Sequence, residues 1–245
     1  MKPVTKSYFA VSRAPRYSVL FALPLLIAYE ALAAVLSGDQ GGTLRNGADV
    51  LFRSIFTAVV GRNGSLVFIA VVIVIGIWFV VRDLKRTRDL PRPSVFLAMF
   101  VESAILALAF GIVVSKLTTH ILGAMHLLAI GQIAEANWAT RLMLSLGAGL
   151  YEELFFRVLL VSALAAGARV WLGANSRMAA VLAAIVAALI FAAFHYIGPY
   201  GDPFQLQSFA FRTISGVAFS ALYLVRGFGI TAWTHALYDV FLLLF

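Results

Sequence analysis

Long apolar runs alternate with short polar connections along the whole chain. Seven such runs cover residues 17–36, 65–81, 95–117, 141–166, 178–195, 207–225 and 228–245. A helix needs about 20 predominantly apolar residues to cross the hydrocarbon core of a bilayer. The pattern therefore predicts an all-α, polytopic transmembrane helix bundle with about seven spans.

Two further segments leave the number of spans open. Residues 48–60 place Asp49 and Arg53 among apolar side chains, a pattern typical of an amphipathic helix at the membrane interface. Residues 120–133 are apolar but short, and an eighth span there would change the side on which the C-terminus emerges. The chain contains no internal repeat.

The composition excludes a soluble protein. Hydrophobic residues make up 62% of the chain and charged residues only 12%, about half of the roughly 25% usual in soluble domains. We therefore expect one integral-membrane domain over residues 1–245. Cysteine is absent, which excludes disulfides, thiolate metal sites and a cysteine nucleophile.

The net charge of +8 is interpreted as a topology signal rather than as a nucleic-acid surface. Basic residues concentrate in segments 1–16, 82–94 and 167–177 and at Arg226. With seven spans, all of these segments fall on one side, which the positive-inside rule makes the cytoplasm, together with the N-terminus. We expect run 17–36 to be retained as the first span, because Pro24, Tyr29 and Glu30 interrupt the apolar core that a signal peptide would need.

Three charges lie within six residues inside run 141–166, at Glu152, Glu153 and Arg157. Each charge at mid-bilayer costs about 2.5–3.5 kcal/mol on insertion scales, so such residues usually face the protein interior. Glu153 and Arg157 are four residues apart, the spacing of a pair on one helix face. Glu152 has no partner at helical spacing, which makes it the candidate functional residue.

Two later runs carry ionisable groups as well. His195 ends the segment Phe191-Ala-Ala-Phe-His195, and His235 and Asp239 lie four residues apart on one helix face. If these groups meet Glu152, the set can activate water, with a carboxylate as general base and a histidine as donor to an oxyanion. Carboxylate and imidazole are also zinc ligands. No cofactor is predicted; if a divalent metal is present, its candidate ligands are Glu152, His195 and His235.

Each motif also has a purely structural interpretation. Glu152 and Glu153 can form a polar contact that fixes helix packing, and His195 can cap a helix at the interface. His235 and Asp239 can form an interhelical hydrogen bond worth about 0.6 kcal/mol. Two more carboxylates in apolar runs, Glu30 and Glu102, can serve a proton path, but we expect each to pair locally with an arginine or to face a water cavity.

The motifs together resemble the CPBP family of intramembrane glutamic-type peptidases, which includes type II CAAX prenyl endopeptidases and bacterial relatives linked to bacteriocin immunity. The resemblance rests on Glu152-Glu153-x-x-x-Arg157, Phe191-x-x-x-His195 and His235-x-x-x-Asp239, in this order and each in an apolar run. It covers residues 141–245, which we expect to form the catalytic core. Residues 1–140 contain N-terminal spans of unassigned role.

The resemblance implies a role for each matching residue. Glu152 matches the glutamate that activates water, and His195 matches the histidine that shares this water. His235 matches the histidine that stabilises the oxyanion. Glu153 and Arg157 match a supporting, orienting pair.

Asp239 departs from the asparagine that is more usual in the family. An ionised aspartate cannot donate a hydrogen bond to an oxyanion. Asp239 can instead be protonated, or it can accept from His235 and keep that ring cationic.

The resemblance implies an intramembrane endopeptidase that hydrolyses a peptide bond of a membrane-associated or lipid-modified protein or peptide. Its partners would be that substrate, prenylated or otherwise anchored, and the lipid bilayer, with no nucleic acid; its location would be a prokaryotic plasma (inner) membrane. The alternatives are a proton-coupled membrane transporter and a non-catalytic membrane immunity or scaffold protein. In the expected topology His195 and His235 lie toward opposite ends of their spans, so the site can form only if helices are tilted, kinked or extended.

Overall fold

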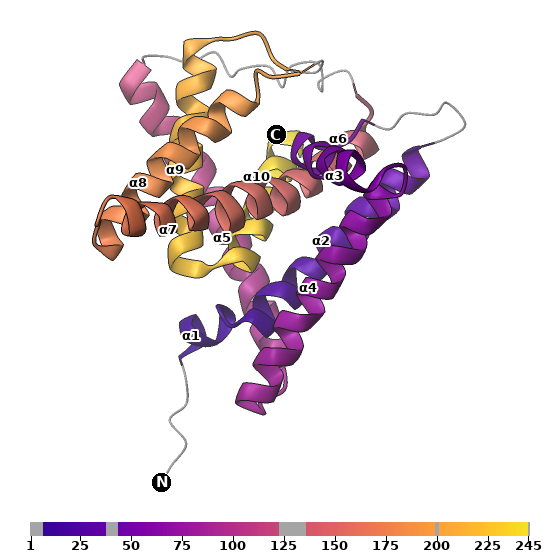
Figure 1. Ribbon diagram of the computed structural model, residues 1–245. Helices are drawn as coiled ribbons and strands as arrows, with labels where there is room; N and C mark the ends of the chain where they lie inside the picture. Colours follow the sequence, from indigo (N-terminus) through magenta and orange to yellow (C-terminus); the bar gives the residue numbers. More distant parts are fainter. Residues whose placement is uncertain (1–6, 38–43, 123–135, 199–200, 245) are drawn as a thin grey trace.

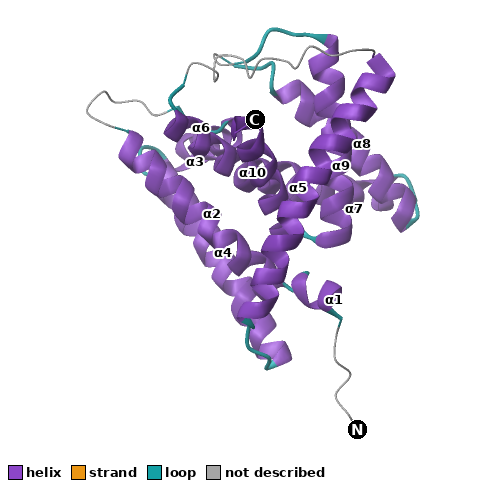
Figure 2. Cartoon of the chain, turned by 180° about the vertical axis from the view of Figure 1, so that it is seen from behind, coloured by secondary structure: helices purple, strands orange, loops and turns teal. Residues whose placement is uncertain are grey.

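The computed structural model describes residues 7–37, 44–122, 136–198 and 201–244, and all regular elements in these ranges are helical. The helices are α1 (Tyr8–Ser12), α2 (Pro15–Leu36), α3 (Gly47–Val60), α4 (Gly64–Thr87), α5 (Pro93–Leu122), α6 (Trp138–Gly147), η2 (Ala148–Val161), α7 (Ser162–Trp171), α8 (Ser176–Phe194), α9 (Leu206–Arg226) and α10 (Phe228–Leu244). Figures 1 and 2 show them as one bundle. The prediction of an all-α fold is confirmed.

The number of long apolar helices agrees with the expected spans. Six are long and apolar enough to cross a membrane: α2, α4, α5, α8, α9 and the continuous helix formed by α6, η2 and α7. The shorter apolar helix α10 completes a bundle of about seven spans. The protein is therefore an integral membrane protein.

The two ambiguous segments have different outcomes. Residues 48–60 form most of α3, a helix of 14 residues that is too short to be among the candidate spans. Residues 120–122 continue α5, while the rest of segment 120–133 lies outside the described residues. α5 therefore runs five residues beyond its predicted end at residue 117.

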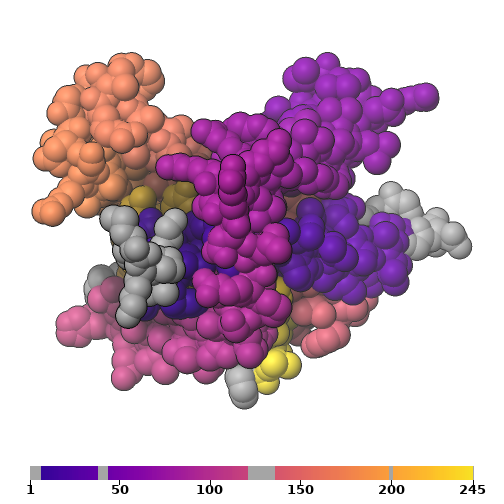
Figure 3. Space-filling model, turned by 90° about the horizontal axis from the view of Figure 1, so that it is seen from below, coloured from indigo at the N-terminus to yellow at the C-terminus, as the bar shows by residue number. Residues whose placement is uncertain are grey.

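Ion pairs join the basic segments at one end of the bundle. Arg16 bonds Asp83 at 2.7 Å and Asp89 at 3.2 Å, which ties the start of α2 to the end of α4 and the following connection. Arg226, at the end of α9, pairs with Glu102 of α5 at 2.6 Å. The view from below shows the end of α4, the start of α5 and the α7–α8 connection on one face (Figure 3). This shared end is what the charge-based topology requires.

Glu30 and Glu102, the two glutamates in apolar runs outside the motifs, are each paired with an arginine, as expected. Glu30 of α2 lies 2.5 Å from Arg53 and 3.4 Å from Arg45. Glu102 accepts from Arg226 and, at 2.5 Å, from the hydroxyl of Tyr8 in α1. Burial and the neighbouring carboxylate raise the pKa of Tyr8 above its ordinary value, so its hydroxyl remains a donor at neutral pH.

Candidate functional site

The two adjacent glutamates lie on η2, where the backbone forms a π-helix over Ala148–Val161. π-helical turns are wider than α-helical turns and often occur at functional sites. Glu152 and Glu153 are both buried, with Glu153 fully enclosed. Since charges are costly in an apolar interior, each carboxylate needs partners there.

Glu153 is held from two sides. The Nε of Arg157 lies 3.2 Å from one carboxylate oxygen, which confirms the pair predicted from the four-residue spacing. The Nδ1 of His235, on α10, lies 2.7 Å from the other oxygen. Glu153 therefore links η2 to α10, a contact that the sequence spacing did not indicate.

Arg157 is enclosed by aromatic rings. Its side chain is 1% exposed, and its guanidinium carbon lies 4.5 Å from the ring centroid of Phe191 and 5.6 Å from that of Phe219. Aromatic faces attract a cation most strongly where water is excluded. The guanidinium thus has favourable neighbours on α8 and α9 as well as Glu153.

His195 immediately follows α8, and its ring orientation is determined by the backbone. Its Nδ1 lies 2.8 Å from the carbonyl oxygen of Phe191. A carbonyl can only accept, so Nδ1 carries the proton and Nε2 keeps a lone pair. The ring of Phe191 lies 4.8 Å from the ring of His195 and 6.5 Å from that of His235, so the two histidines lie on either side of one aromatic side chain near η2. The neutral ring can therefore accept a hydrogen bond from a water beside Glu152.

His235 lies between two carboxylates. Its Nδ1 bonds Glu153, and its Nε2 lies 3.8 Å from an oxygen of Asp239, too far for a direct hydrogen bond. The ring stacks on Phe219 with centroids 4.3 Å apart. Asp239 is thus near the imidazole but not directly hydrogen-bonded to it.

The structure brings residues from three elements together despite their expected difference in depth. The helix Trp138–Trp171 has 34 residues, more than the roughly 20 that cross a bilayer perpendicularly. Figure 1 shows η2 and α7 running across the bundle at a steep angle to α8 and α9. His235 is bonded to Glu153, the neighbour of Glu152, and Phe191 packs against the rings of both His195 and His235. A strongly inclined helix therefore resolves the difference in depth.

Asn46 also reaches this site, although the sequence assigned no role to residues 1–140. Its side-chain Nδ2 donates to Oε1 of Glu152 at 2.8 Å, across 106 positions of sequence. An asparagine before an amphipathic run indicates a helix N-cap, and Asn46 does cap α3. No sequence pattern indicated its contact with Glu152, because that contact depends on how α3 packs.

The candidate metal ligands do not form a metal site. In the described part of the chain, no three His, Asp or Glu side chains are grouped so that they could hold a metal ion. The Nδ1 atoms of His195 and His235 are already engaged by Phe191 and Glu153. Each ring therefore keeps its Nε2 as the nitrogen that a metal could bind, and the mechanism proposed below has no metal-dependent step.

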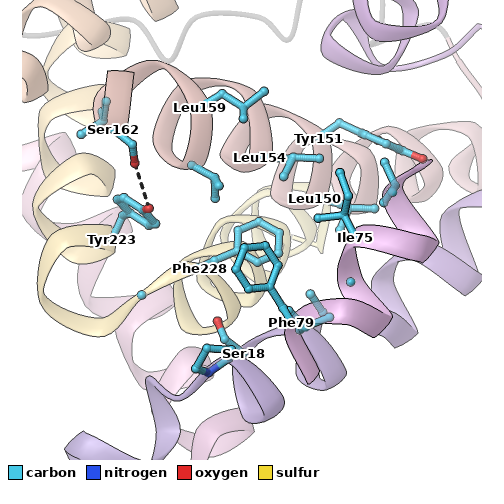
Figure 4. Close-up of a pocket in the computed structure, with 18 of the residues that line it drawn as sticks. Ser18, Ile75, Phe79, Leu150, Tyr151, Leu154, Leu159, Ser162, Tyr223 and Phe228 are labelled. Carbon is cyan, nitrogen blue, oxygen red and sulfur yellow. Dashed lines mark hydrogen bonds between the residues drawn. The ribbon is translucent and has the colours of Figure 1, made fainter. Parts of the chain in front are cut away.

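An apolar cavity lies on another face of η2. It has a volume of about 1110 Å³ and is lined by side chains from α2, α4, η2 and α7. Leu150, Tyr151 and Leu154 of η2 border it (Figure 4). The six candidate residues are not among the described residues that line it. The cavity and the polar cluster therefore occupy different faces of the same helix.

Comparison with known proteins supports the family resemblance. Residues 134–241 match the family described as type II CAAX prenyl endopeptidase Rce1-like. This range contains all six candidate residues and confirms the resemblance to intramembrane CAAX-type peptidases. Neither a curated protein nor a solved structure matches the chain.

Proposed function

We propose that this membrane protein, whose residues 134–241 belong to the Rce1-like type II CAAX prenyl endopeptidase family, is an intramembrane endopeptidase that uses Glu152 and His195 to activate water. The family implies a protein or peptide substrate in the membrane. The observation that carries the proposal is geometric: His235 of α10 bonds Glu153, the neighbour of Glu152 on η2, and the ring of Phe191 lies within 4.8 Å of His195 and 6.5 Å of His235. Three ionisable groups from separate elements can then act on one peptide bond.

The first step is attack by water on the peptide carbonyl. Water donates one hydrogen bond to Glu152 and one to the free Nε2 of His195. The water oxygen bonds to the carbonyl carbon while Glu152 takes a proton from that water. The carbonyl π electrons move onto the carbonyl oxygen. A general base held in position contributes typically about 10²- to 10⁴-fold to such a step.

His235 stabilises the oxyanion formed in that step. Its Nδ1–H donates to Glu153, so donation from Nε2 requires the doubly protonated, cationic ring. The carboxylates of Glu153 and Asp239 flank this ring, and each stabilises the cation when it is ionised. Asp239 thereby supports an oxyanion donor without having to donate a hydrogen bond itself.

The second step breaks the carbon–nitrogen bond. The oxyanion electrons reform the carbonyl, the bonding pair leaves with nitrogen, and Glu152 returns its proton to the departing amine. The products are a carboxylic acid and an amine, and the Glu152 carboxylate is regenerated. We propose that the substrate is prenylated or otherwise anchored in the membrane, so that its scissile bond lies beside η2. We propose that this membrane is a prokaryotic plasma (inner) membrane.

The transporter alternative requires carboxylates that can take up and release protons along a path. Glu30 and Glu102 are instead each bonded to arginine side chains. These contacts give both residues a structural role, because each joins its own helix to an arginine of another element. This pairing gives the peptidase the stronger support.

The proposal is tested by comparing membrane-protein termini in cells that contain the wild-type chain, Glu152→Ala or His195→Ala. We expect a shifted terminus only with the wild-type chain, and equal amounts of each variant in the membrane. Asp89→Asn is the matched control, because Asp89 is an exposed carboxylate in the α4–α5 connection and should leave cleavage unchanged. Continued cleavage in both site variants would refute the mechanism.

A further inference from the structure

Asn46 precedes α3 and lies outside the region that matches the peptidase family. We propose that Asn46 is a positioning residue that fixes the Glu152 carboxylate for water activation. This inference rests on the proposed function and assigns part of the site to the N-terminal region. It follows from the orientation of the Asn46 amide, from the hydrogen bonds that hold Asn46 in place, and from its hydrogen bond to Glu152.

The amide of Asn46 can take only one orientation. The backbone N–H of Ala48 donates to its Oδ1 at 2.9 Å, and the NH2 group of the amide could not accept that hydrogen bond. Nδ2 must therefore face Glu152, where it donates to Oε1 at 2.8 Å. Both residues are buried, at 7% and 8% exposure, so this bond competes little with water.

This hydrogen bond has a different character from the contacts of Glu153. Glu153 has two charged partners, Arg157 and His235, which oppose its action as a base. In the described ranges, Asn46 is the side chain that hydrogen-bonds Glu152. A neutral amide orients the carboxylate while leaving Oε2 to receive a proton. Of the two glutamates, Glu152 is therefore the one arranged to act as the base.

A network of hydrogen bonds fixes the backbone of Asn46. Its backbone N–H donates to the hydroxyl oxygen of Tyr29 at 3.2 Å, and that hydroxyl donates to Asp49 at 2.9 Å. Asp49 is fully buried and accepts from Arg45 and Arg53 at 2.8 and 2.6 Å. The arginines fix Asp49, Asp49 fixes Tyr29, and Tyr29 fixes the backbone of Asn46.

Gly147 permits this network to approach the glutamate helix. A Cβ at position 147 would lie 2.5 Å from the ring of Tyr29 and 2.9 Å from the Cβ of Asn46. Such distances are below any normal contact, so a larger residue would displace one of the two. The absence of a side chain at the end of α6 thus allows Asn46 to reach Glu152.

The two roles of Asn46 can be separated by substitution. Asn46→Ser keeps a side-chain oxygen that caps α3, but its side chain is too short for one atom to cap Ala48 and another to reach Glu152. Asn46→Ala removes both the cap and the donor. The matched control is Asn175→Ser, because Asn175 is an exposed N-cap of α8 that accepts from the N–H of Met178. All variants are made in the full chain.

The measurement is kcat, KM and the unfolding temperature in proteoliposomes, with a synthetic peptide that spans the cleavage site found by the terminus comparison. We expect Asn46→Ser and Asn46→Ala to lower kcat about 10- to 100-fold, the range of a lost hydrogen bond to a charged group, with KM unchanged. Only Asn46→Ala should also lower the unfolding temperature. Asn175→Ser should match the wild-type protein in kcat.

Wild-type kcat in Asn46→Ser would overturn the proposal, because it would leave Asn46 a helix cap only. A lower unfolding temperature in Asn46→Ser that accounts for the lost activity would overturn it as well. Glu152→Ala, measured in parallel, separates the two proposals. Cleavage retained by Glu152→Ala contradicts the proposed function, whereas an inactive Glu152→Ala beside a fully active Asn46→Ser contradicts the positioning role alone.

Discussion

Each histidine of the site has one ring nitrogen engaged by the protein, and the partner differs in charge. His195 donates to a neutral backbone carbonyl, which favours a neutral ring with a free lone pair. His235 donates to the Glu153 carboxylate and has Asp239 nearby, which favours a cationic ring. The same residue type is thus prepared to accept from water in one place and to donate to an oxyanion in the other.

Asp239→Asn tests the cationic form of His235. The substitution removes one of the two anions beside the ring, leaves Glu153 in place and restores the asparagine more usual in the family. With less negative charge nearby, the ring loses its proton at lower pH. We therefore expect the alkaline limb of the pH–rate profile to move to lower pH, with cleavage retained on the acidic side. An unchanged alkaline limb would show that Asp239 does not support the cation.

Removal of metal ions tests whether cleavage depends on a divalent metal. Because the described His, Asp and Glu side chains do not group into a metal site, we expect cleavage to continue after dialysis of the purified protein against a strong divalent chelator. The measurement is the cleavage rate before and after dialysis, with the metal content of the sample determined independently. Loss of cleavage that returns on addition of one metal would contradict this account.

The sequence predicts the contact that lies within one helix but not the contacts between helices. Glu153 and Arg157 were predicted as a pair because helical spacing alone places them together. The contact of Glu153 with His235 could not be predicted, since it depends on how η2 and α10 pack. The contact of Asn46 with Glu152 depends in addition on the position of α3.

At the level of elements, the site depends on the close approach of η2 and α10. A Cβ at Gly149 would lie 2.4 Å from the carbonyl oxygen of Ala232 and 2.6 Å from the Cβ of Ala236. Backbone cannot move aside as a flexible side chain can, so α10 would have to shift. His235 lies on the same helix, between Ala232 and Asp239, and would move with it.

Gly149→Ala is therefore expected to lower cleavage and the unfolding temperature together. Gly111→Ala in α5 is the matched control, because a Cβ there would meet the ring of Tyr238 at 3.4 Å, an ordinary contact. An alanine inside a helix is also favoured over glycine by about 1 kcal/mol. Both quantities are measured for the two variants in the same proteoliposomes. Unchanged cleavage in Gly149→Ala would show that α10 need not lie so close.

The helices themselves were largely predictable, because a membrane span has a clear requirement for length and polarity. Segment 65–81 forms the centre of α4, and the amphipathic pattern at 48–60 forms α3 rather than a span. Helix ends were less accurate, as α5 shows by extending to Leu122. The π-helical form of η2 has no sequence signal in apolar periodicity, since it depends on backbone hydrogen bonding and on neighbouring helices.

At the scale of the whole molecule, contacts at one end agree with the distribution of basic residues. The start of α2, the α4–α5 connection and the end of α9 are joined by ion pairs. These contacts agree with a topology that places the basic segments on one side. We propose that this side, with the N-terminus, is cytoplasmic.

The absence of cysteine from the chain permits a direct test of this topology. We expect a single cysteine introduced by Asp89→Cys to react with an impermeant thiol reagent only after the membrane is opened. Arg62→Cys, between α3 and α4, should react in intact cells. The wild-type chain is the unlabelled control. The opposite labelling pattern would place the N-terminus outside.

The central claim is that Glu152 and His195 jointly activate the attacking water. The most direct measurement is the cleavage rate of one peptide by the wild-type protein, Glu152→Gln and His195→Gln in proteoliposomes of equal protein content. Glu152→Gln keeps the approximate side-chain volume but removes the general base, and His195→Gln removes the imidazole whose Nε2 accepts from the water. We predict that each falls about 10²- to 10⁴-fold in kcat, the contribution expected of a positioned base and its partner. Cleavage within a few fold of the wild-type rate by Glu152→Gln would contradict the account.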